Sequence, residues 1–125
     1  MEKVFVGGVM RDIEEETMTE IRRPYKNKGE DRRATLSWVR QIPIEGKPEN
    51  VAVLFEANSK WMVSHEIPKL FIDVKPGQIV FQVDLDIIRS SPNHAEITVK
   101  GLHHPQEDTP DDIGRGLRDW YKKIG

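Results

Sequence analysis

The chain has 125 residues, of which 37% are hydrophobic and 32% are charged, and its net charge is −2. This length fits one domain, residues 1–125, which can bury one core without covalent cross-links. The sequence contains no cysteine, which excludes disulfides, thiolate-held zinc and a cysteine nucleophile. The small net charge excludes a general electrostatic attraction to nucleic acid, so any such binding requires a local basic patch.

No stretch of the sequence is long and apolar enough to form the core of a signal peptide or a membrane span. The absence of cysteine fits a reducing compartment. We therefore expect a soluble, cytoplasmic protein that does not bind a membrane.

The N-terminal third predicts a strand followed by charged segments. Val4–Met10 is apolar and is interrupted by two glycines, which favours a first strand with a bulge or tight bend. The acidic segment 11–20 fits either a short helix or a second strand. Residues 22–33 contain Pro, Asn and Gly but almost no apolar side chain, so they predict an exposed basic loop.

The middle of the chain predicts four short strands. Ala34–Ile42 alternates apolar and polar residues and places Trp38 on the core face. After a turn rich in Pro and Gly, the continuous apolar run Val51–Phe55 is typical of a central strand covered on both sides. Lys60–His65 and Lys69–Val74 complete the set.

A clear alternation follows the predicted turn at Lys75–Gly77. Apolar residues take every second position from Ile79 to Ile87, which predicts an amphipathic strand. Ala95–Val99 alternates in the same way and predicts the partner strand of an antiparallel hairpin.

The last segment changes to a helical period. Thr109 and Pro110 are typical of a helix start, and acidic residues follow them at the positive end of the helix dipole. Apolar residues then recur every three or four positions and include Trp120. The sequence therefore predicts a C-terminal amphipathic helix over residues 109–124.

Two local patterns bear on the fold class. Leu36–Pro48 resembles the second framework strand of antibody variable domains, which implies a β-sandwich, but the cysteine pair of those domains is absent. The terminal helix with Trp120 resembles that of pleckstrin-homology-type domains, which implies a barrel closed by a helix. We predict a mainly β fold: an antiparallel β-sandwich or a partly open barrel of about six to eight short strands with a C-terminal amphipathic helix.

No catalytic motif stands out, so the leading hypothesis is a small non-enzymatic binding or adaptor domain that needs no cofactor. It would present loops or a sheet edge to a protein partner, and the sequence leaves its oligomeric state open. The predicted contact residues are charged or aromatic, with two apolar anchors: Arg22, Arg23, Tyr25, Lys26, Lys28, Arg32, Arg33, Trp61 and Met62.

Two alternatives remain open. The first is a nucleic-acid-binding module in which residues 22–33 grip phosphates and Tyr25 stacks on a base. The second is a metal-dependent hydrolase or nuclease, because carboxylates beside a lysine can hold a metal and stabilise charge. Its candidate residues are Glu56, Asp73, Lys75 and Asp84.

The histidines give a weaker signal. His103 and His104 precede Glu107 and Asp108, and all four side chains are of the metal-binding kind. Adjacent side chains on an extended backbone point in opposite directions, so one metal would not easily take both histidines. We therefore predict that the chain holds no metal.

Overall fold

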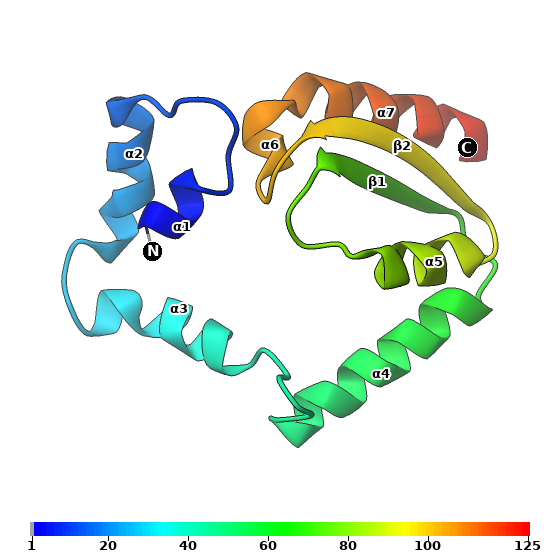
Figure 1. Cartoon of the computed structure of the whole chain (residues 1–125), viewed down its shortest axis with the longest axis horizontal. Coiled ribbons are helices and arrows are strands. Elements are labelled where there is room, and N and C mark those ends of the chain that lie inside the picture. The colour runs from blue at the N-terminus through cyan, green and yellow to red at the C-terminus, as the bar shows by residue number, and fades with distance from the viewer. Residues whose placement is uncertain (1) are drawn as a thin grey trace. The chain divides into compact units, whose positions relative to one another are not determined.

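Figure 1 shows the computed structural model of the chain, which describes residues 2–125. The elements are, in order, α1 (Glu2–Val6), α2 (Glu15–Arg22), the 3-10 helix η1 (Arg23–Tyr25), α3 (Glu30–Arg40), α4 (Glu49–Ser64), β1 (Lys69–Pro76), α5 (Gln82–Ser90), β2 (His94–Gly101), α6 (Pro105–Asp108) and α7 (Pro110–Ile124). Helices make up 57% of the structure, and the two strands found among the described residues are parallel. The prediction of a mainly β fold, as an antiparallel sandwich or a partly open barrel, is therefore wrong.

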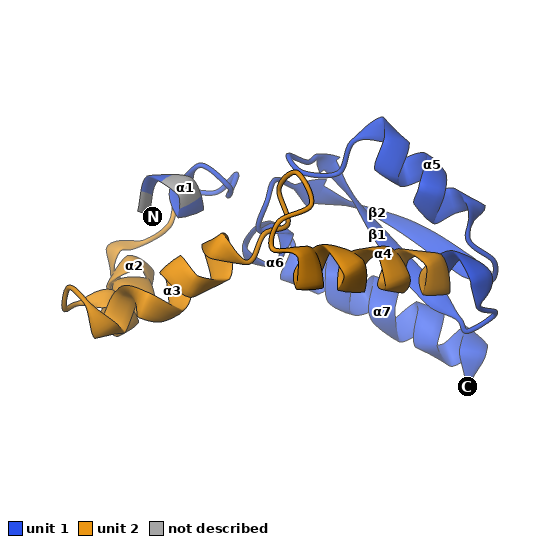
Figure 2. Cartoon of the chain, turned by 90° about the horizontal axis from the view of Figure 1, so that it is seen from below, with its two compact units in different colours: residues 1–12, 63–125 blue, residues 13–62 orange. Residues whose placement is uncertain are grey.

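The chain forms two compact units, which are coloured separately in Figure 2. Residues 13–62 make up one unit, which contains α2, η1, α3 and most of α4. Residues 1–12 and 63–125 make up the other, which contains α1, both strands and the helices α5, α6 and α7. No helix within residues 2–125 combines the length and the apolar character needed to cross a membrane.

The strands β1 and β2 form a parallel pair joined by α5. Their register runs from Lys69 opposite His94 to Pro76 opposite Gly101. A parallel pair needs a crossover connection, and α5 supplies it. In both ribbon views α5 and α7 lie on opposite sides of the strand pair. Strand, helix, strand and helix in this order are typical of α/β architecture rather than of a β-sandwich.

The predicted strand over Ile79–Ile87 is wrong, because this segment enters α5. The carboxylate of Asp84 caps the helix start by accepting a hydrogen bond from the Phe81 amide at 2.9 Å. Leu85 is the buried residue of α5, at 6% exposure. The hairpin prediction fails with it, since the partner of β2 is β1 and the pairing is parallel.

A lysine ties together the loops that lead into the two strands. Lys69 is only 9% exposed, and its Nζ donates to the carbonyl oxygens of His65 (2.5 Å), Ile67 (3.0 Å) and Pro92 (2.8 Å). An ammonium has three N–H donors, so all of them are used. The Asn93 side chain adds a bond to the Glu66 carbonyl at 2.6 Å across the same loops.

The terminal helix α7 begins at Pro110, where the sequence places a helix start. It runs close to β2 at one point, since a Cβ on Gly116 would lie 2.1 Å from Cδ1 of Ile97. A Cβ on Gly114 would meet nothing within 4 Å. Gly116 therefore permits the close packing of α7 on β2, whereas Gly114 has no such role.

The remaining predicted strands are helical or irregular. Ala34–Ile42 lies largely in α3, and both Val51–Phe55 and most of Lys60–His65 lie in α4. Trp38, predicted for the core, is 67% exposed. Val4–Met10 is the end of α1 and a loop instead of a first strand. Short apolar runs are compatible with both element types, so the sequence pattern alone misassigned them.

Candidate active site

The carboxyl ends of the two parallel strands form the edge at which open α/β sheets bind ligands. β1 ends at Pro76 and β2 at Gly101, which are partners in the register, and the Gly77 amide donates to the Gly101 carbonyl at 3.1 Å. His103 and His104 follow β2 directly. The chain therefore places two imidazoles at this edge.

Three segments that are distant in sequence converge there. The His104 amide donates to the Gly8 carbonyl at 2.9 Å, and the Gln78 side chain donates to the Gly7 carbonyl at 2.9 Å. A Cβ on Gly8 would lie 2.9 Å from Cβ of His103 and 3.0 Å from Cδ2 of His104. The backbone at Gly8 can approach the histidines this closely only because it carries no side chain.

The two histidines occupy different environments. His104 is half-buried, with its ring 4.8 Å from that of Phe5 and 4.4 Å from that of His103. Partial burial, and next the neighbouring His103, lower the pKa of His104 below its ordinary value. The His103 side chain is exposed. An imidazole at an exposed position can accept a proton from water or from a reacting group.

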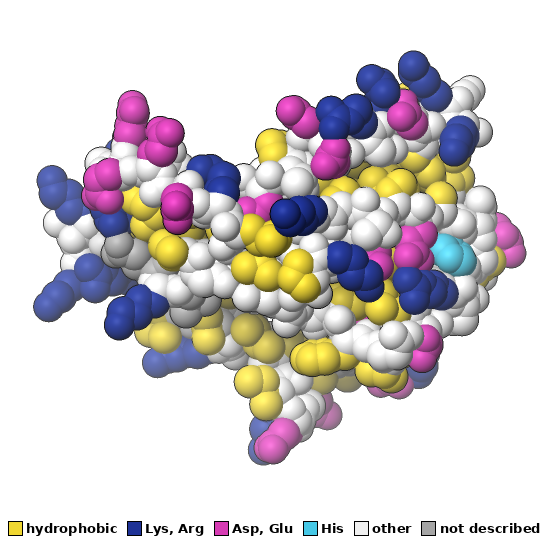
Figure 3. Space-filling model, turned by 45° about the horizontal axis from the view of Figure 1, so that its top comes forward, with side chains coloured by type: hydrophobic (Ala, Val, Ile, Leu, Met, Phe, Trp, Pro, Cys, Tyr) yellow, Lys and Arg dark blue, Asp and Glu magenta, His cyan; other side chains and the backbone are white. Residues whose placement is uncertain are grey.

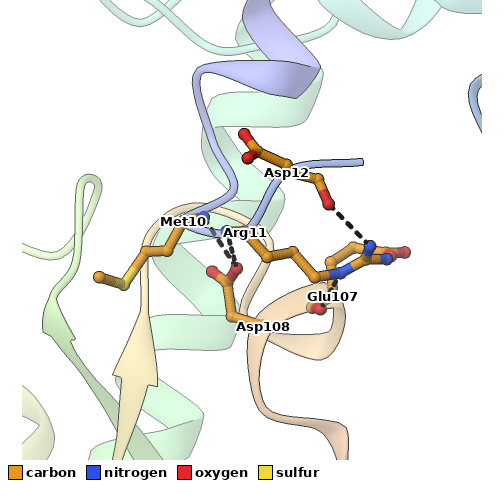
Figure 4. Close-up of polar contacts among 5 residues, drawn as sticks. All are labelled: Met10, Arg11, Asp12, Glu107 and Asp108. Carbon is orange, nitrogen blue, oxygen red and sulfur yellow. Dashed lines mark hydrogen bonds and ion pairs between the residues drawn. The ribbon is translucent and has the colours of Figure 1, made fainter. Parts of the chain in front are cut away.

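A cluster of charged residues joins the N-terminal segment to α6, as Figure 4 shows. Oδ1 of Asp108 accepts hydrogen bonds from the amides of Met10 (2.8 Å) and Arg11 (3.1 Å). The Arg11 guanidinium donates to the Glu107 carbonyl at 2.6 Å and forms an ion pair with the Glu107 carboxylate at 2.8 Å. A third donor of Arg11 reaches the Asp12 carbonyl at 3.3 Å. These contacts hold residues 10–12 against α6.

The residues predicted to form a basic contact loop lie mostly in helices. Residues 22–33, called the basic segment below, contain the end of α2, all of η1 and the start of α3, so the loop prediction is wrong in its structure. Three of the arginines form ion pairs with nearby glutamates: Arg22 with Glu15, Arg23 with Glu20 and Arg33 with Glu30. The other predicted contact residues of this segment are Tyr25 in η1, Lys26 and Lys28 after it, and Arg32 in α3.

The predicted apolar anchors, Trp61 and Met62, lie in α4 and are 44% and 43% exposed. Figure 3 shows hydrophobic side chains at the surface beside both kinds of charged side chain. Binding through Trp61, Met62 or the basic segment stays a prediction.

The residues of the metal-site hypothesis have other partners. Glu56 pairs with Lys60 at 2.6 Å, and that hydrogen bond lowers the pKa of the Glu56 carboxyl. Asp73 is buried in β1 and pairs with Lys75 at 3.0 Å, while Asp84 caps α5. Across residues 2–125 no group of three His, Asp or Glu side chains is placed to hold a metal ion. Nothing in the geometry of these residues supports metal catalysis.

The sequence interpretation missed most of this edge. It weighed His103 and His104 only as metal ligands, it gave Gly8 a role only in a strand bulge or tight bend, and it gave Arg11 no role. A signal was available for the histidines, because they come directly after a strand. None was available for Arg11, whose partner Glu107 lies 96 residues further along the chain.

Comparisons with known proteins find similar enzymes, most of them haloalkane dehalogenases. The chain is 46% identical to a haloalkane dehalogenase of Mycolicibacterium smegmatis over 125 residues, which are 99% of this chain and 40% of that protein. It is 35% identical to a coelenterazine h 2-monooxygenase of Renilla reniformis, with 99% of this chain and 40% of that protein covered. No protein-family model matches.

The fold has the same likeness. A crystal structure of a haloalkane dehalogenase from Bradyrhizobium elkani superposes with a TM-score of 0.91 at 31% identity, covering 98% of this chain and 43% of that one. Haloalkane dehalogenases have the α/β-hydrolase fold. The chain spans about two fifths of the length of the curated relatives it matches. These similarities to hydrolytic enzymes overturn the prediction of a non-enzymatic adaptor domain.

Proposed function

We propose that this chain supplies part of a hydrolase of the haloalkane dehalogenase type. In a dehalogenation of this type, water replaces the halogen of a haloalkane, which yields an alcohol, a halide ion and a proton. The observation that carries the proposal is the exposed His103 at the carboxyl edge of a parallel strand pair. The similarity to dehalogenases in sequence and in fold supports it.

The role proposed for His103 is that of the general base. In α/β-hydrolases the base histidine comes last of the catalytic residues along the chain, after the final strand that carries the site. His103 fits this place two residues beyond β2, and its ring is exposed. His104 packs on Phe5 and gives its amide to Gly8, which suits a supporting residue better than a base.

Such a site also needs a nucleophile and an acid that orients the histidine. Neither of these two residues has to lie in this chain. The relatives have a further three fifths of their length that this chain does not span. Among residues 2–125 the His103 ring contacts the ring of His104 but forms no hydrogen bond or ion pair. We therefore propose that the carboxylate partner of His103 comes from that further part.

A test must separate hydrolysis from the other chemistry found among the relatives. One fold can host unrelated reactions, and the Renilla relative is a monooxygenase. The experiment replaces the equivalent two fifths of the Mycolicibacterium dehalogenase with this chain, and this fusion is called the graft below. Halide release from 1-bromobutane and light emission with coelenterazine h are both measured.

The proposal expects the graft to release halide and to emit no light above the background of the parent enzyme. A folded graft without halide release, or one that emits light, would contradict it. We also propose a cytoplasmic location, because the cysteine-free sequence suits a reducing compartment.

A further inference from the structure

We infer that Asp108 and Arg11 form a clamp that positions His103 for the hydrolytic step. The kinetic consequence of this inference rests on the proposed function, whereas the structural consequence does not. Among the described residues neither Asp108 nor Arg11 forms a hydrogen bond or an ion pair with His103, so both act through the backbone around it.

Asp108 holds the N-terminal segment through hydrogen bonds to its side chain. Its Oδ1 accepts hydrogen bonds from two consecutive amides, those of Met10 and Arg11, which lie 98 and 97 residues away in sequence. Hydrogen bonds to an ionised carboxylate are roughly twice as strong as neutral ones. Its other oxygen, Oδ2, is buried and has no hydrogen-bond partner among the described residues. The attachment of Asp108 therefore depends on the two amides.

Arg11 strengthens the same attachment from the opposite side. Its guanidinium binds both the carbonyl and the carboxylate of Glu107, at 2.6 and 2.8 Å. The side chain of Asp108 thus holds the backbone of Arg11, while the side chain of Arg11 holds Glu107. Such reciprocal contacts restrain both segments more strongly than a single exposed ion pair would.

Backbone contacts connect the clamp to the two histidines. Gly8 lies two residues before Met10, and its carbonyl accepts the His104 amide at 2.9 Å. The Glu107 amide donates to the His104 carbonyl at 2.9 Å, so His104 is bonded directly to α6. The backbone of Gly8 lies against Cβ of His103, where an added Cβ would be only 2.9 Å away. A closed ring of contacts therefore runs from the clamp to the base of the His103 side chain.

Loosening the clamp is therefore expected to move the Gly8 backbone, which lies against Cβ of His103. A misplacement of about 1 Å in a catalytic group can cost about 100-fold in rate, even when the mutated residue is distant from the chemistry. Asp108→Ala is expected to lower kcat of the graft about 10- to 100-fold and to leave KM within about twofold. Asp108→Asn keeps an oxygen acceptor for the two amides and is expected to have a smaller effect in the same direction.

A double mutant tests whether the effect passes through His103. In a His103→Gln background, Asp108→Ala is expected to cause no further loss of the residual rate, because the group it positions is already gone. An equal loss in both backgrounds would show a general structural defect and would overturn the inference. Arg118→Gln is the control, since Arg118 forms an exposed ion pair with Asp119 in α7.

A spectroscopic measurement on the full chain needs no activity. With isotope-labelled histidine, the ring signals of His103 and His104 are expected to shift in Asp108→Asn and in Arg11→Gln, and to stay unchanged in Arg118→Gln. Unchanged ring signals in both clamp variants would overturn the inference even if the graft is a dehalogenase. Shifted signals in a chain whose graft releases no halide would support the clamp and contradict only the proposed function.

Discussion

Replacing Lys69 by methionine is expected to lower the free energy of unfolding by about 3 kcal/mol. Methionine keeps the apolar stem of this buried side chain but removes the ammonium that bonds the carbonyls of His65, Ile67 and Pro92. A hydrogen bond to a charged group contributes about 1.5–3 kcal/mol, and a buried acceptor left unpaired costs about 1–3 kcal/mol.

The three carbonyls belong to exposed or half-buried residues, so water can replace part of what the ammonium supplies. We therefore take about 1 kcal/mol for each lost bond. With an unfolding entropy of about 2.1 cal/mol/K per residue over 125 residues, the melting temperature should fall by about 11 °C.

The assay is denaturant unfolding of the full chain, followed by circular dichroism. The matched control is Lys60→Met, which removes an exposed ion pair with Glu56 in α4 and should change stability far less than Lys69→Met does. Equal losses in the two variants would refute the view that the three hydrogen bonds of Lys69 hold the strand entries together.

Two further predictions concern packing and pH. Gly114→Ala should stabilise the chain by up to about 1 kcal/mol, because alanine has the higher helix propensity. Gly116→Ala should destabilise it, because the new Cβ would collide with Ile97. Thermal unfolding of both variants checks these two predictions. Because burial lowers the pKa of His104, the folded state binds its proton less readily than the unfolded state, so stability should fall as the pH drops below about 6.5. His104→Phe should weaken this loss of stability at low pH. If the pH dependence of stability is the same in His104→Phe, the prediction is wrong.

Part of the fold was accessible from the sequence. The apolar segment Lys69–Val74 is a strand, and Ala95–Val99 lies within another. The start of α7 coincides with Pro110, because a proline at the first helical position carries local information that tertiary contacts did not override. Thr109 precedes it but does not cap the helix, since its hydroxyl donates to the Lys100 carbonyl at 2.8 Å.

Other parts were not accessible in this way. The alternation over Ile79–Ile87 fits a strand, yet Asp84 caps a helix three residues after Phe81. The run Val51–Phe55 is short and apolar, and such runs do not separate a buried strand from a helix. A strand over Ile79–Ile87 predicts a hairpin in place of the parallel crossover, and that error favours the β-sandwich.

The candidate site depended on the same step. His103 becomes a candidate base only when β1 and β2 are known to be parallel, because only then do their carboxyl ends share an edge. The clamp residues Arg11 and Asp108 are nearly a hundred positions apart in sequence, and no local pattern links them.

The central claim is tested most directly by kcat for halide release from 1-bromobutane in the graft. The account predicts that His103→Gln lowers kcat by about 100- to 10,000-fold, the usual contribution of a general base. It predicts that His104→Gln lowers kcat by less than about tenfold, because His104 only supports its neighbour. A graft that keeps its rate without His103, or that loses it equally without His104, would contradict the account.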